Sequence, residues 1–240
     1  LTTVLTLLLV AAGCWGFIEL ADEVLEGETR AFDHFVLQSL RNPEAPHTPI
    51  GPPWFRESVR DVTALGSAVV LLLVTLAVAG FCLIARNWTA MGAVLVAALG
   101  GLLMSQFLKH ALYRERPTVV PHLVDVATPS FPSGHSMMSA AVYLTLGVVL
   151  ARFVARRPLK SYFIVVATTL TVLVGLSRIY LGVHYPTDVL AGWTAGAVWA
   201  LLCGTFVYQM PATTSTDEVG ASCDSRLPLN GGNRGQRTRR

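Results

Sequence analysis

The sequence predicts an all-α integral-membrane protein built as a bundle of six transmembrane helices. Hydrophobic residues make up 52% of the 240 residues and charged residues only 14%, with a mean hydropathy of +0.53, whereas soluble domains carry about 25% charged residues. Apolar segments long enough to cross a bilayer, which takes about 20 residues, recur along the chain. This composition excludes a disordered chain, a coiled coil and an ordinary soluble globular protein. A net charge of only +3 from scattered basic residues gives no support for a nucleic-acid partner.

Four of the six predicted helices contain no Asp, Glu, Lys or Arg. These are the segments 1–18, 63–85, 88–108 and 189–210. The segment 136–155 spans the membrane if Arg152 reaches the surface along its aliphatic stem. The segment 161–177 is shorter and can extend through Leu181. A secretory signal peptide is the rival interpretation of the first segment, but this segment shows no basic n-region and no small-residue cleavage site.

The distribution of charge between the predicted loops indicates the orientation in the membrane. The loops after helices 2 and 4, together with the C-terminal segment, hold ten basic and three acidic residues; the opposite side holds eight basic and twelve acidic residues. The ten basic residues are Arg86, Arg152, Arg156, Arg157, Lys160, Arg226, Arg234, Arg237, Arg239 and Arg240. Because cytoplasmic loops carry the excess of Lys and Arg, we expect this side in the cytoplasm and the other side on the periplasmic or extracellular face.

Two domains of unequal character are expected. Residues 1–210 form the six-helix membrane domain, and residues 211–240, rich in Thr, Ser, Gly and Arg without periodicity, form a disordered cytoplasmic tail. Between helices 1 and 2, the segment 19–61 is polar and acidic. Its apolar residues recur at helical spacing, which favours an amphipathic helix on the outer interface, although a loop capping the helix ends fits equally well. These residues are Phe32, Phe35, Val36 and Leu40.

Small residues inside the apolar segments have structural interpretations. Gly192 and Gly196 form a G-x-x-x-G pattern, which we interpret as close helix packing within the bundle rather than as a dimer face. Cys14, Cys82 and Cys203 lie in apolar runs and are expected to be small buried hydrophobic residues. Since no C-x-x-C pair exists, the cysteines support neither a zinc site nor a redox motif.

Polar residues that are expensive to place in a bilayer collect at the ends of the last four predicted helices. They are Lys109, Arg116, Ser133, His135, Arg178, His184 and Asp188, and Gly134 lies between two of them at a helix start. Because the spans alternate in direction, all of these residues fall on the same outer side of the membrane. We therefore expect them to converge on one site.

The three cations of this set, Lys109, Arg116 and Arg178, predict an anionic ligand. The guanidinium fork matches the oxygens of a phosphate, and the helix start at Ser133–Gly134 offers unpaired backbone N–H groups to an anion. An interfacial anchor would explain any one of these cations, but not three together with this helix start. A phosphate-sized oxyanion is the expected ligand.

Two histidines predict that the bound phosphate reacts. Asp188 follows His184 by four residues, a spacing that lets its carboxylate accept the imidazole Nδ1–H and leaves Nε2 as an unprotonated nucleophile. His135, at a different helix end, can deliver a proton to a leaving oxygen as general acid. A zinc or two-metal site is the rival chemistry, but it would need more histidines or carboxylates and fewer cations. We therefore expect no metal and no other cofactor.

These residues resemble the tripartite signature of the type 2 phosphatidic acid phosphatase superfamily. The three blocks occur in order with the family's spacing: Lys109 with Arg116–Pro117, Pro132–Ser133–Gly134–His135, and Ser177–Arg178 with His184 and Asp188. The segment 21–41 also resembles bacterial members of the group, such as phosphatidylglycerophosphatase B. The tail after residue 210 lies outside the resemblance.

The resemblance implies a role for each residue of the signature. His184 would attack phosphorus and form a phosphohistidine, with Asp188 orienting it. His135 would protonate the departing lipid oxygen and then activate the water that hydrolyses the intermediate. The phosphoryl oxygens would be held by Lys109, Arg116, Ser133, the backbone of Gly134 and Arg178.

The expected function is that of a membrane lipid phosphatase that hydrolyses a phosphate monoester or a pyrophosphate on a lipid. Candidate substrates are phosphatidate, phosphatidylglycerophosphate, diacylglycerol pyrophosphate and undecaprenyl pyrophosphate. Two alternatives stay open: a lipid phosphotransferase using the same residues, and a non-hydrolytic transporter of phosphate lipids, although transporters place charged sites near the bilayer midplane rather than at helix ends. A scaffold with a degenerate site is disfavoured by the complete signature. The only expected partner is the lipid phosphate substrate in the bilayer, with no nucleic acid and no obligate protein partner.

Overall fold

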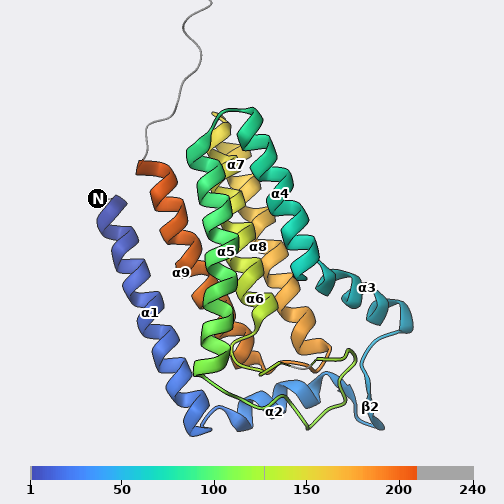
Figure 1. Cartoon of the computed structure of the whole chain (residues 1–240). Helices are drawn as coiled ribbons and strands as arrows, with labels where there is room; N and C mark the ends of the chain where they lie inside the picture. Colours follow the sequence, from blue (N-terminus) through green and yellow to red (C-terminus); the bar gives the residue numbers. More distant parts are fainter. Residues whose placement is uncertain (1, 127, 210–240) are drawn as a thin grey trace, which may run out of the picture. The chain divides into compact units, whose positions relative to one another are not determined.

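The computed structural model describes residues 2–126 and 128–209, and helices dominate them (Figure 1). The predicted tail 211–240 lies outside the described residues. In chain order the elements are α1 (Thr2–Glu26), α2 (Arg30–Ser39), β1 (Arg41–Asn42), β2 (Ala45–Pro49), α3 (Pro53–Ala64), α4 (Ala68–Ile84), α5 (Trp88–Ala111), α6 (Gly134–Ser139), the π-helical turn η1 (Ala140–Leu144), α7 (Thr145–Phe153), α8 (Arg157–Tyr180) and α9 (Pro186–Gln209). The short strands β1 and β2 pair in antiparallel fashion.

The predicted six-helix membrane bundle is confirmed. Five helical segments of the described chain are long and apolar enough to cross a membrane, and α3 with α4 makes a sixth if this bent pair counts as one span. The elements α6, η1 and α7 run on without a break and form one of the five, from Gly134 to Phe153.

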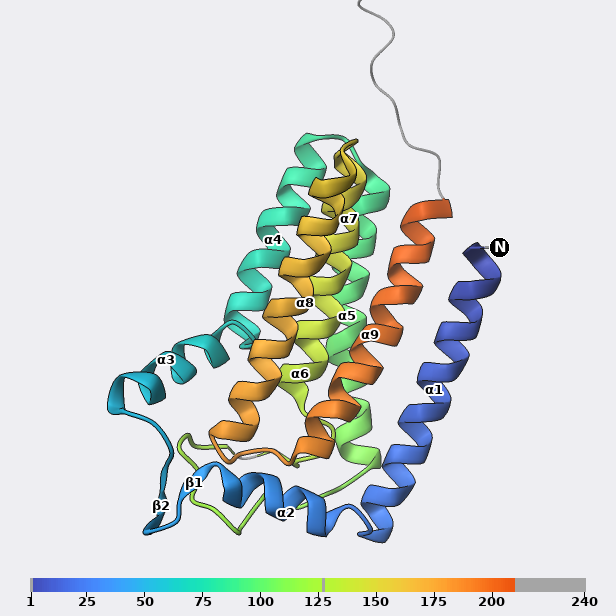
Figure 2. The ribbon, with the colours of Figure 1, turned by 180° about the vertical axis from the view of Figure 1, so that it is seen from behind.

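The continuous helix of α6, η1 and α7 lies at the centre of the bundle. It packs against α5, α8 and α9 (Figure 2), and 67% of its apolar window is buried, compared with 6% for α1, which lies along α9. Gly192 and Gly196 of α9 make this packing possible: a Cβ at Gly196 would stand 2.3 Å from the carbonyl oxygen of Met137, and one at Gly192 would stand 2.7 Å from that of Ser133. The predicted packing role of the G-x-x-x-G pattern is therefore confirmed.

The second predicted span differs from the structure because the chain bends within it. The segment 63–85 was expected to be continuous, but α3 ends at Ala64 and α4 begins at Ala68, with a 50° bend between them. The Ser67 side chain caps α4 by accepting the N–H of Val70. Gly66 lies so close to α8 that a Cβ there would meet Val174 at 2.4 Å. The bend therefore lies directly against α8.

Two other predictions need correction. The helix α1 continues to Glu26, beyond the predicted end at residue 18, because polar residues end a membrane span without ending a helix. Cys14, expected to be buried, is exposed on α1, whereas Cys82 and Cys203 are buried as predicted. The reason is that α1 packs against the bundle along one side only.

The segment between α1 and α4 contains the helix α2 (residues 30–39). Its buried residues are Asp33 and Leu37, whereas Phe32 and Phe35 are 52% and 71% exposed. The apolar side chains that suggested the helix therefore do not all face the protein. Whether this helix lies in the membrane interface stays a prediction.

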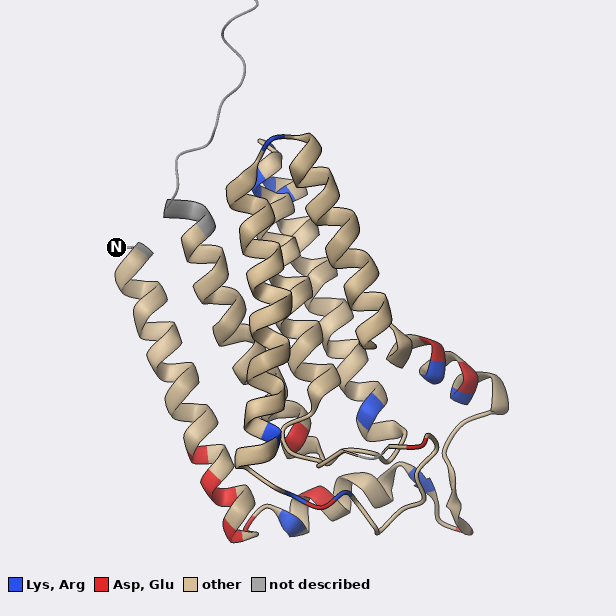
Figure 3. Cartoon of the chain, in the orientation of Figure 1, with Lys and Arg blue, Asp and Glu red and all other residues tan. Residues whose placement is uncertain are grey.

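Charged residues separate between the two ends of the described bundle (Figure 3). All described acidic residues belong to the end formed by α2, α3 and the starts of α6 and α9, or to the adjoining end of α1. At the opposite end, every charged residue among those described is basic: Arg86, Arg152, Arg156, Arg157 and Lys160.

Candidate active site

The predicted site residues lie at the acidic end of the bundle, where four helices and two loops meet. Lys109 comes from the last turn of α5, Ser133 to His135 from the start of α6, Arg178 from the last turn of α8, and Asp188 from the first turn of α9. Arg116 and His184 come from the loops that follow α5 and α8. The alternation of the spans thus brings together residues that are up to 79 positions apart in the sequence.

Lys109 is buried against the start of α6. Its ammonium group donates a hydrogen bond of 2.6 Å to the carbonyl oxygen of Pro129, and the residue is 6% exposed. A Cβ at Gly134 would stand 3.3 Å from Cε of Lys109, so the absence of a side chain at Gly134 leaves room for the lysine.

The two arginines of the set are held by neutral oxygens. Arg116 donates from Nε to the carbonyl oxygen of Thr128 at 2.7 Å and from Nη1 to that of Val183 at 2.6 Å. Arg178 donates from Nη1 to Oγ1 of Thr63 at 3.2 Å, while its Nε is buried without a partner.

Within the described residues, none of these three cations forms an ion pair with a carboxylate. Lys109 and Arg178 each interact electrostatically with Arg116, and Lys109 also interacts with Arg178. Burial lowers the pKa of Arg116, whereas Asp188 acts in the opposite direction. The site therefore concentrates three cations that no direct ion pair neutralises in the described chain, although Asp188 acts electrostatically on Lys109 and Arg116.

His184 is held between this positive cluster and a buried carboxylate. Its Nδ1 lies 3.5 Å from Oδ2 of Asp188, and its Nε2 lies 3.3 Å from Nη1 of Arg116. Because a guanidinium has only donors, Nε2 must accept in this contact, which puts the ring proton on Nδ1 facing Asp188. Burial lowers the pKa of His184 to about 3, against the opposing effect of Asp188. The imidazole is therefore neutral, with its lone pair on Nε2.

His135 is partly exposed and shares the site with the other groups. It interacts electrostatically with Arg178, His184, Lys109 and Arg116, and among the described residues its ring forms no hydrogen bond. A Cβ at Gly66 would stand 3.2 Å from Cδ2 of His135, so the bend between α3 and α4 borders the imidazole. Both ring nitrogens are thus free for a ligand.

Ser133 has a structural task at the start of α6. Its Oγ caps the helix by accepting from the backbone N–H and the hydroxyl of Ser136, and its own N–H donates to the carbonyl oxygen of Asp188 at 2.9 Å. The side chain is fully buried. The first free backbone donors of the helix belong to the residues that follow Ser133.

The structure adds residues that the sequence reasoning did not assign. Arg114 donates from Nη1 to Asp188 and from Nη2 to Asp33, and Oγ of Ser130 donates a hydrogen bond to Oδ2 of Asp188. Thr187 connects Asp33 and Arg114 through its hydroxyl. The only sequence signal was the position of Arg114 two residues before Arg116, because Asp33 and Ser130 lie outside the three motifs.

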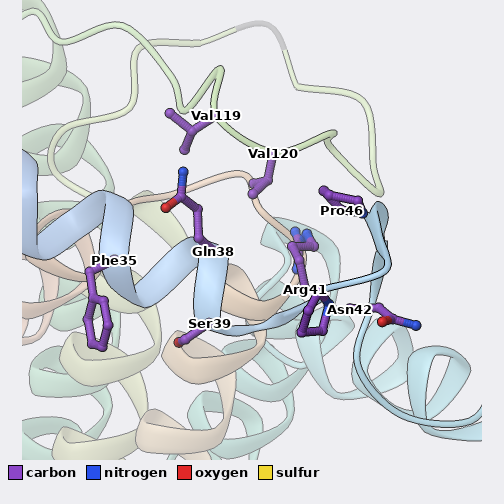
Figure 4. A pocket seen from close by; sticks show the side chains of 9 residues that line it. Phe35, Gln38, Ser39, Arg41, Asn42, Pro46, Val119 and Val120 are labelled. Atoms are coloured by element: carbon purple, nitrogen blue, oxygen red, sulfur yellow. The ribbon is translucent and has the colours of Figure 1, made fainter.

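A separate pocket of about 450 Å³ lies beside α2 and the loop that contains Val119 and Val120 (Figure 4). Arg41 contributes to its wall and donates from Nη1 to the carbonyl oxygens of Leu40 and Tyr180. The Nε and Nη2 atoms of Arg41 are buried without hydrogen-bond partners. None of the predicted site residues lines this pocket, so it is distinct from the histidine site.

Comparison with known proteins identifies relatives of the chain. The family model described as "PAP2 superfamily" matches residues 68–211, more than half of the chain. Phosphatidylglycerophosphatase B of Bacillus subtilis is 38% identical over 151 residues, which cover 61% of this chain and 72% of that protein. Decaprenylphosphoryl-5-phosphoribose phosphatase of Mycolicibacterium smegmatis is 34% identical, over 45% of this chain and 53% of that protein.

A solved structure agrees with the fold. The crystal structure of a transmembrane PAP2-type phosphatidylglycerolphosphate phosphatase from Bacillus subtilis superimposes with a TM-score of 0.74 and 29% identity, covering 85% of this chain and 98% of that one. The names of these relatives describe phosphatases that act on lipids.

Proposed function

The chain belongs to the PAP2 superfamily, and from this premise we propose that it hydrolyses a phosphate monoester or pyrophosphate on a membrane lipid. The reaction proceeds through a phosphohistidine and without a metal ion. The candidate substrates are phosphatidate, phosphatidylglycerophosphate, diacylglycerol pyrophosphate and undecaprenyl pyrophosphate. Its homologues are lipid phosphatases, which supports phosphatase activity for this chain.

A single observation carries the proposal: Arg116 and Arg178 act on the neutral imidazole of His184, Lys109 lies within electrostatic reach of both arginines, and none of the three cations forms an ion pair with a carboxylate in the described chain. Burying unpaired cations costs free energy, and an anion that binds among them recovers it. A phosphoryl group brings the matching charge and oxygens to within reach of Nε2 of His184. Binding and attack then use the same cluster.

In the proposed first step, Nε2 of His184 attacks phosphorus. A phosphoryl oxygen replaces Nε2 as the acceptor for Nη1 of Arg116, which frees the lone pair. Asp188 holds the Nδ1–H side of the ring and stabilises the positive charge that develops on the imidazole. The P–O bond to the lipid breaks as His135 delivers a proton to the leaving oxygen.

In the second step, His135 takes a proton from water, and the water oxygen attacks the phosphohistidine. The P–N bond breaks, so that inorganic phosphate is released and His184 is restored. Throughout both steps Lys109, Arg116 and Arg178, with the hydroxyl hydrogen of Ser133 and the backbone N–H of Gly134, stabilise the charge on the equatorial oxygens. The oxygen of Ser133 keeps its role as the cap of α6 while its hydroxyl hydrogen donates to the ligand. Every proton is transferred by a side chain, so no metal ion is required.

We place the site on the outer face of the cell membrane and the C-terminal tail in the cytoplasm. The support is the basic end opposite the site, which the positive-inside rule assigns to the cytoplasm. A cysteine introduced by Glu44→Cys, in a chain whose native cysteines are replaced by serine, should react with a membrane-impermeant maleimide in intact spheroplasts. Arg86→Cys in the same background should react only after lysis, and the reverse result would invert the topology.

The activity is tested by phosphate release from the four candidate lipids, using purified protein in detergent with excess EDTA. We expect release that persists in EDTA and that falls to background in His184→Ala, because no nucleophile remains. The ranking of the lipids identifies the substrate. Substantial turnover by folded His184→Ala would contradict the phosphohistidine mechanism, and loss of wild-type release in EDTA would contradict metal independence.

A further inference from the structure

We propose that Arg114 and Asp33 are positioning residues that act through Asp188, holding its carboxylate in the orientation in which it directs the His184 ring. This inference rests on the proposed function, because it concerns the carboxylate that we assign to the nucleophile. It also gives a task to the segment between α1 and α4, which belongs to none of the three motifs.

The guanidinium of Arg114 bridges two buried carboxylates. Its Nη1 lies 2.7 Å from Oδ1 of Asp188, and its Nη2 lies 2.8 Å from Oδ2 of Asp33. Both aspartate side chains are 0% exposed and that of Arg114 is 12% exposed. Burial lowers the pKa of Arg114, but the charges and hydrogen bonds of Asp188 and Asp33 outweigh this effect and raise it overall. The cation therefore stays charged between its two partners.

The two oxygens of Asp188 have separate partners, which fixes the rotation of the carboxylate. Oδ1 accepts from Arg114. Oδ2 accepts from Oγ of Ser130 and from the backbone N–H of Tyr185 at 2.8 Å, and it is the oxygen that faces Nδ1 of His184. If Oδ1 lost its donor, Oγ of Ser130 and the N–H of Tyr185 could bond to either oxygen of the carboxylate. The carboxylate could then rotate away from the imidazole.

Asp33 in turn fixes Arg114. Its Oδ2 accepts from the hydroxyl of Thr187 at 2.8 Å, and its Oδ1 accepts from the backbone N–H of Thr187 at 3.2 Å. The guanidinium also lies 4.1 Å above the ring of Tyr185, which is stacked against His34 of α2. The guanidinium thus contacts Asp33 and Asp188 along its edge and Tyr185 on its face. Together these contacts fix its orientation.

The arrangement joins two segments that are 154 positions apart, Asp33 on α2 and Thr187 at the start of α9. Because Thr187 precedes Asp188, α2 is bonded to the backbone that carries the catalytic carboxylate. Neither Arg114 nor Asp33 forms a hydrogen bond with the three phosphate-binding cations in the described chain. A positioning role therefore predicts an effect on the rate of phosphoryl transfer and little effect on phosphate binding.

The test compares Asp33→Asn and Arg114→Lys with the wild type in steady-state assays. Asparagine keeps the shape of Asp33 without its charge, and lysine keeps the charge of Arg114 without the two-pronged guanidinium. We expect kcat to fall by about 10- to 100-fold in Arg114→Lys, the range found when a group that orients a reacting ligand is removed, and by about tenfold in Asp33→Asn. KM and the inhibition constant for inorganic phosphate should stay within about twofold of the wild-type values.

Matched controls separate positioning from a general effect of charge. Asp22→Asn and Arg30→Gln remove an exposed acidic and an exposed basic residue near the same end of the bundle, and both should leave kcat unchanged. Thr187→Val is a third variant, which keeps the side-chain shape and removes the hydroxyl that bonds Asp33 and Arg114. Because it keeps every charge, it carries the test if a charge variant fails to fold, as judged by its thermal midpoint and size-exclusion profile.

The outcomes distinguish this inference from the proposed function. An unchanged kcat in folded Asp33→Asn and Arg114→Lys, or a weakening of phosphate inhibition in proportion to the loss of kcat, would overturn the positioning role while His184→Ala remains inactive. Full turnover by His184→Ala would instead overturn the phosphohistidine assignment itself. A loss of kcat alone, in variants with unchanged phosphate inhibition, supports the role for both residues.

Discussion

Arg114 and Arg116 stand two residues apart in one loop, yet the structure surrounds them in opposite ways. Arg114 is paired with two buried carboxylates, Asp33 and Asp188. Among the described residues Arg116 is hydrogen-bonded to neutral oxygens and to the lone pair of His184, beside two further cations, and it forms no ion pair. We call the first arrangement the paired cluster, comprising Asp33, Arg114 and Asp188, and the second the unpaired cluster, comprising Lys109, Arg116 and Arg178.

The difference shows how one short loop can serve both stability and chemistry. A buried cation that is matched by carboxylates has no unused charge and works as a structural element. A buried cation without a carboxylate raises the free energy of the empty protein, and this cost is recovered when an anion binds. His184 lies at the boundary, with Nδ1 toward the paired cluster and Nε2 toward the unpaired one.

The largest expected effect follows from Asp188→Asn, which removes the negative charge that faces Nδ1 of His184. We expect kcat to fall by about 10³- to 10⁴-fold, since an amide can present its NH₂ group to Nδ1 and so stabilise the wrong tautomer of His184. The measurement is phosphate release under saturating lipid. A folded Asp188→Asn protein with wild-type kcat would contradict the orienting role of the carboxylate.

Removing the cation of the paired cluster should lower the stability of the protein in addition to its kcat. In Arg114→Gln two buried carboxylates lose their shared partner, and we expect a loss of about 3–5 kcal/mol in the free energy of unfolding. Denaturant or thermal unfolding in detergent measures it, with Arg30→Gln on the exposed face of α2 as the control for loss of a positive charge. Equal stability of the two variants would show that the paired cluster is not a structural element.

Removing a cation of the unpaired cluster should act mainly on activity. In Arg116→Gln we expect kcat/KM to fall by about 10²- to 10³-fold, as when one donor to a developing oxyanion is lost. The thermal midpoint should change far less than in Arg114→Gln, because the lost hydrogen bonds to Thr128 and Val183 are offset by removal of a partly buried charge that has no ion pair in the described chain. A large drop in stability with little loss of activity would reverse the comparison.

The smallest expected effect is stabilisation of the whole protein by an oxyanion that occupies the unpaired cluster. Vanadate imitates pentacoordinate phosphorus, so it should inhibit turnover and stabilise the folded state by about 2.7 kcal/mol at 100 times its dissociation constant. The shift in thermal midpoint should be unaffected by EDTA and much reduced in Arg116→Gln. A shift of equal size in both proteins would place the anion elsewhere.

The six spans were predictable because the bilayer imposes one length and one composition on every crossing helix. Five of the six predicted segments are single helices or one continuous helix in the structure, with ends that differ by several residues. The bend at Leu65 to Ser67 was not predictable, because hydropathy does not report that Gly66 approaches α8. The exposed position of Cys14 was not predictable from hydropathy either, because an apolar residue of a membrane helix can face lipid as well as protein.

The site residues were predictable as a set, because polar groups at the ends of alternating spans must share one side of the membrane. The sequence alone therefore determined the helical class, the convergence of Lys109, Arg116, Arg178 and the two histidines, and the spacing of His184 and Asp188. It could not determine which arginine would be neutralised. That was decided by the tertiary structure, which brings Asp33 on α2 next to Arg114 but not to Arg116. The physical reason is that a charge pair depends on distances of a few ångströms, whereas hydropathy and spacing locate residues only to one end of a helix.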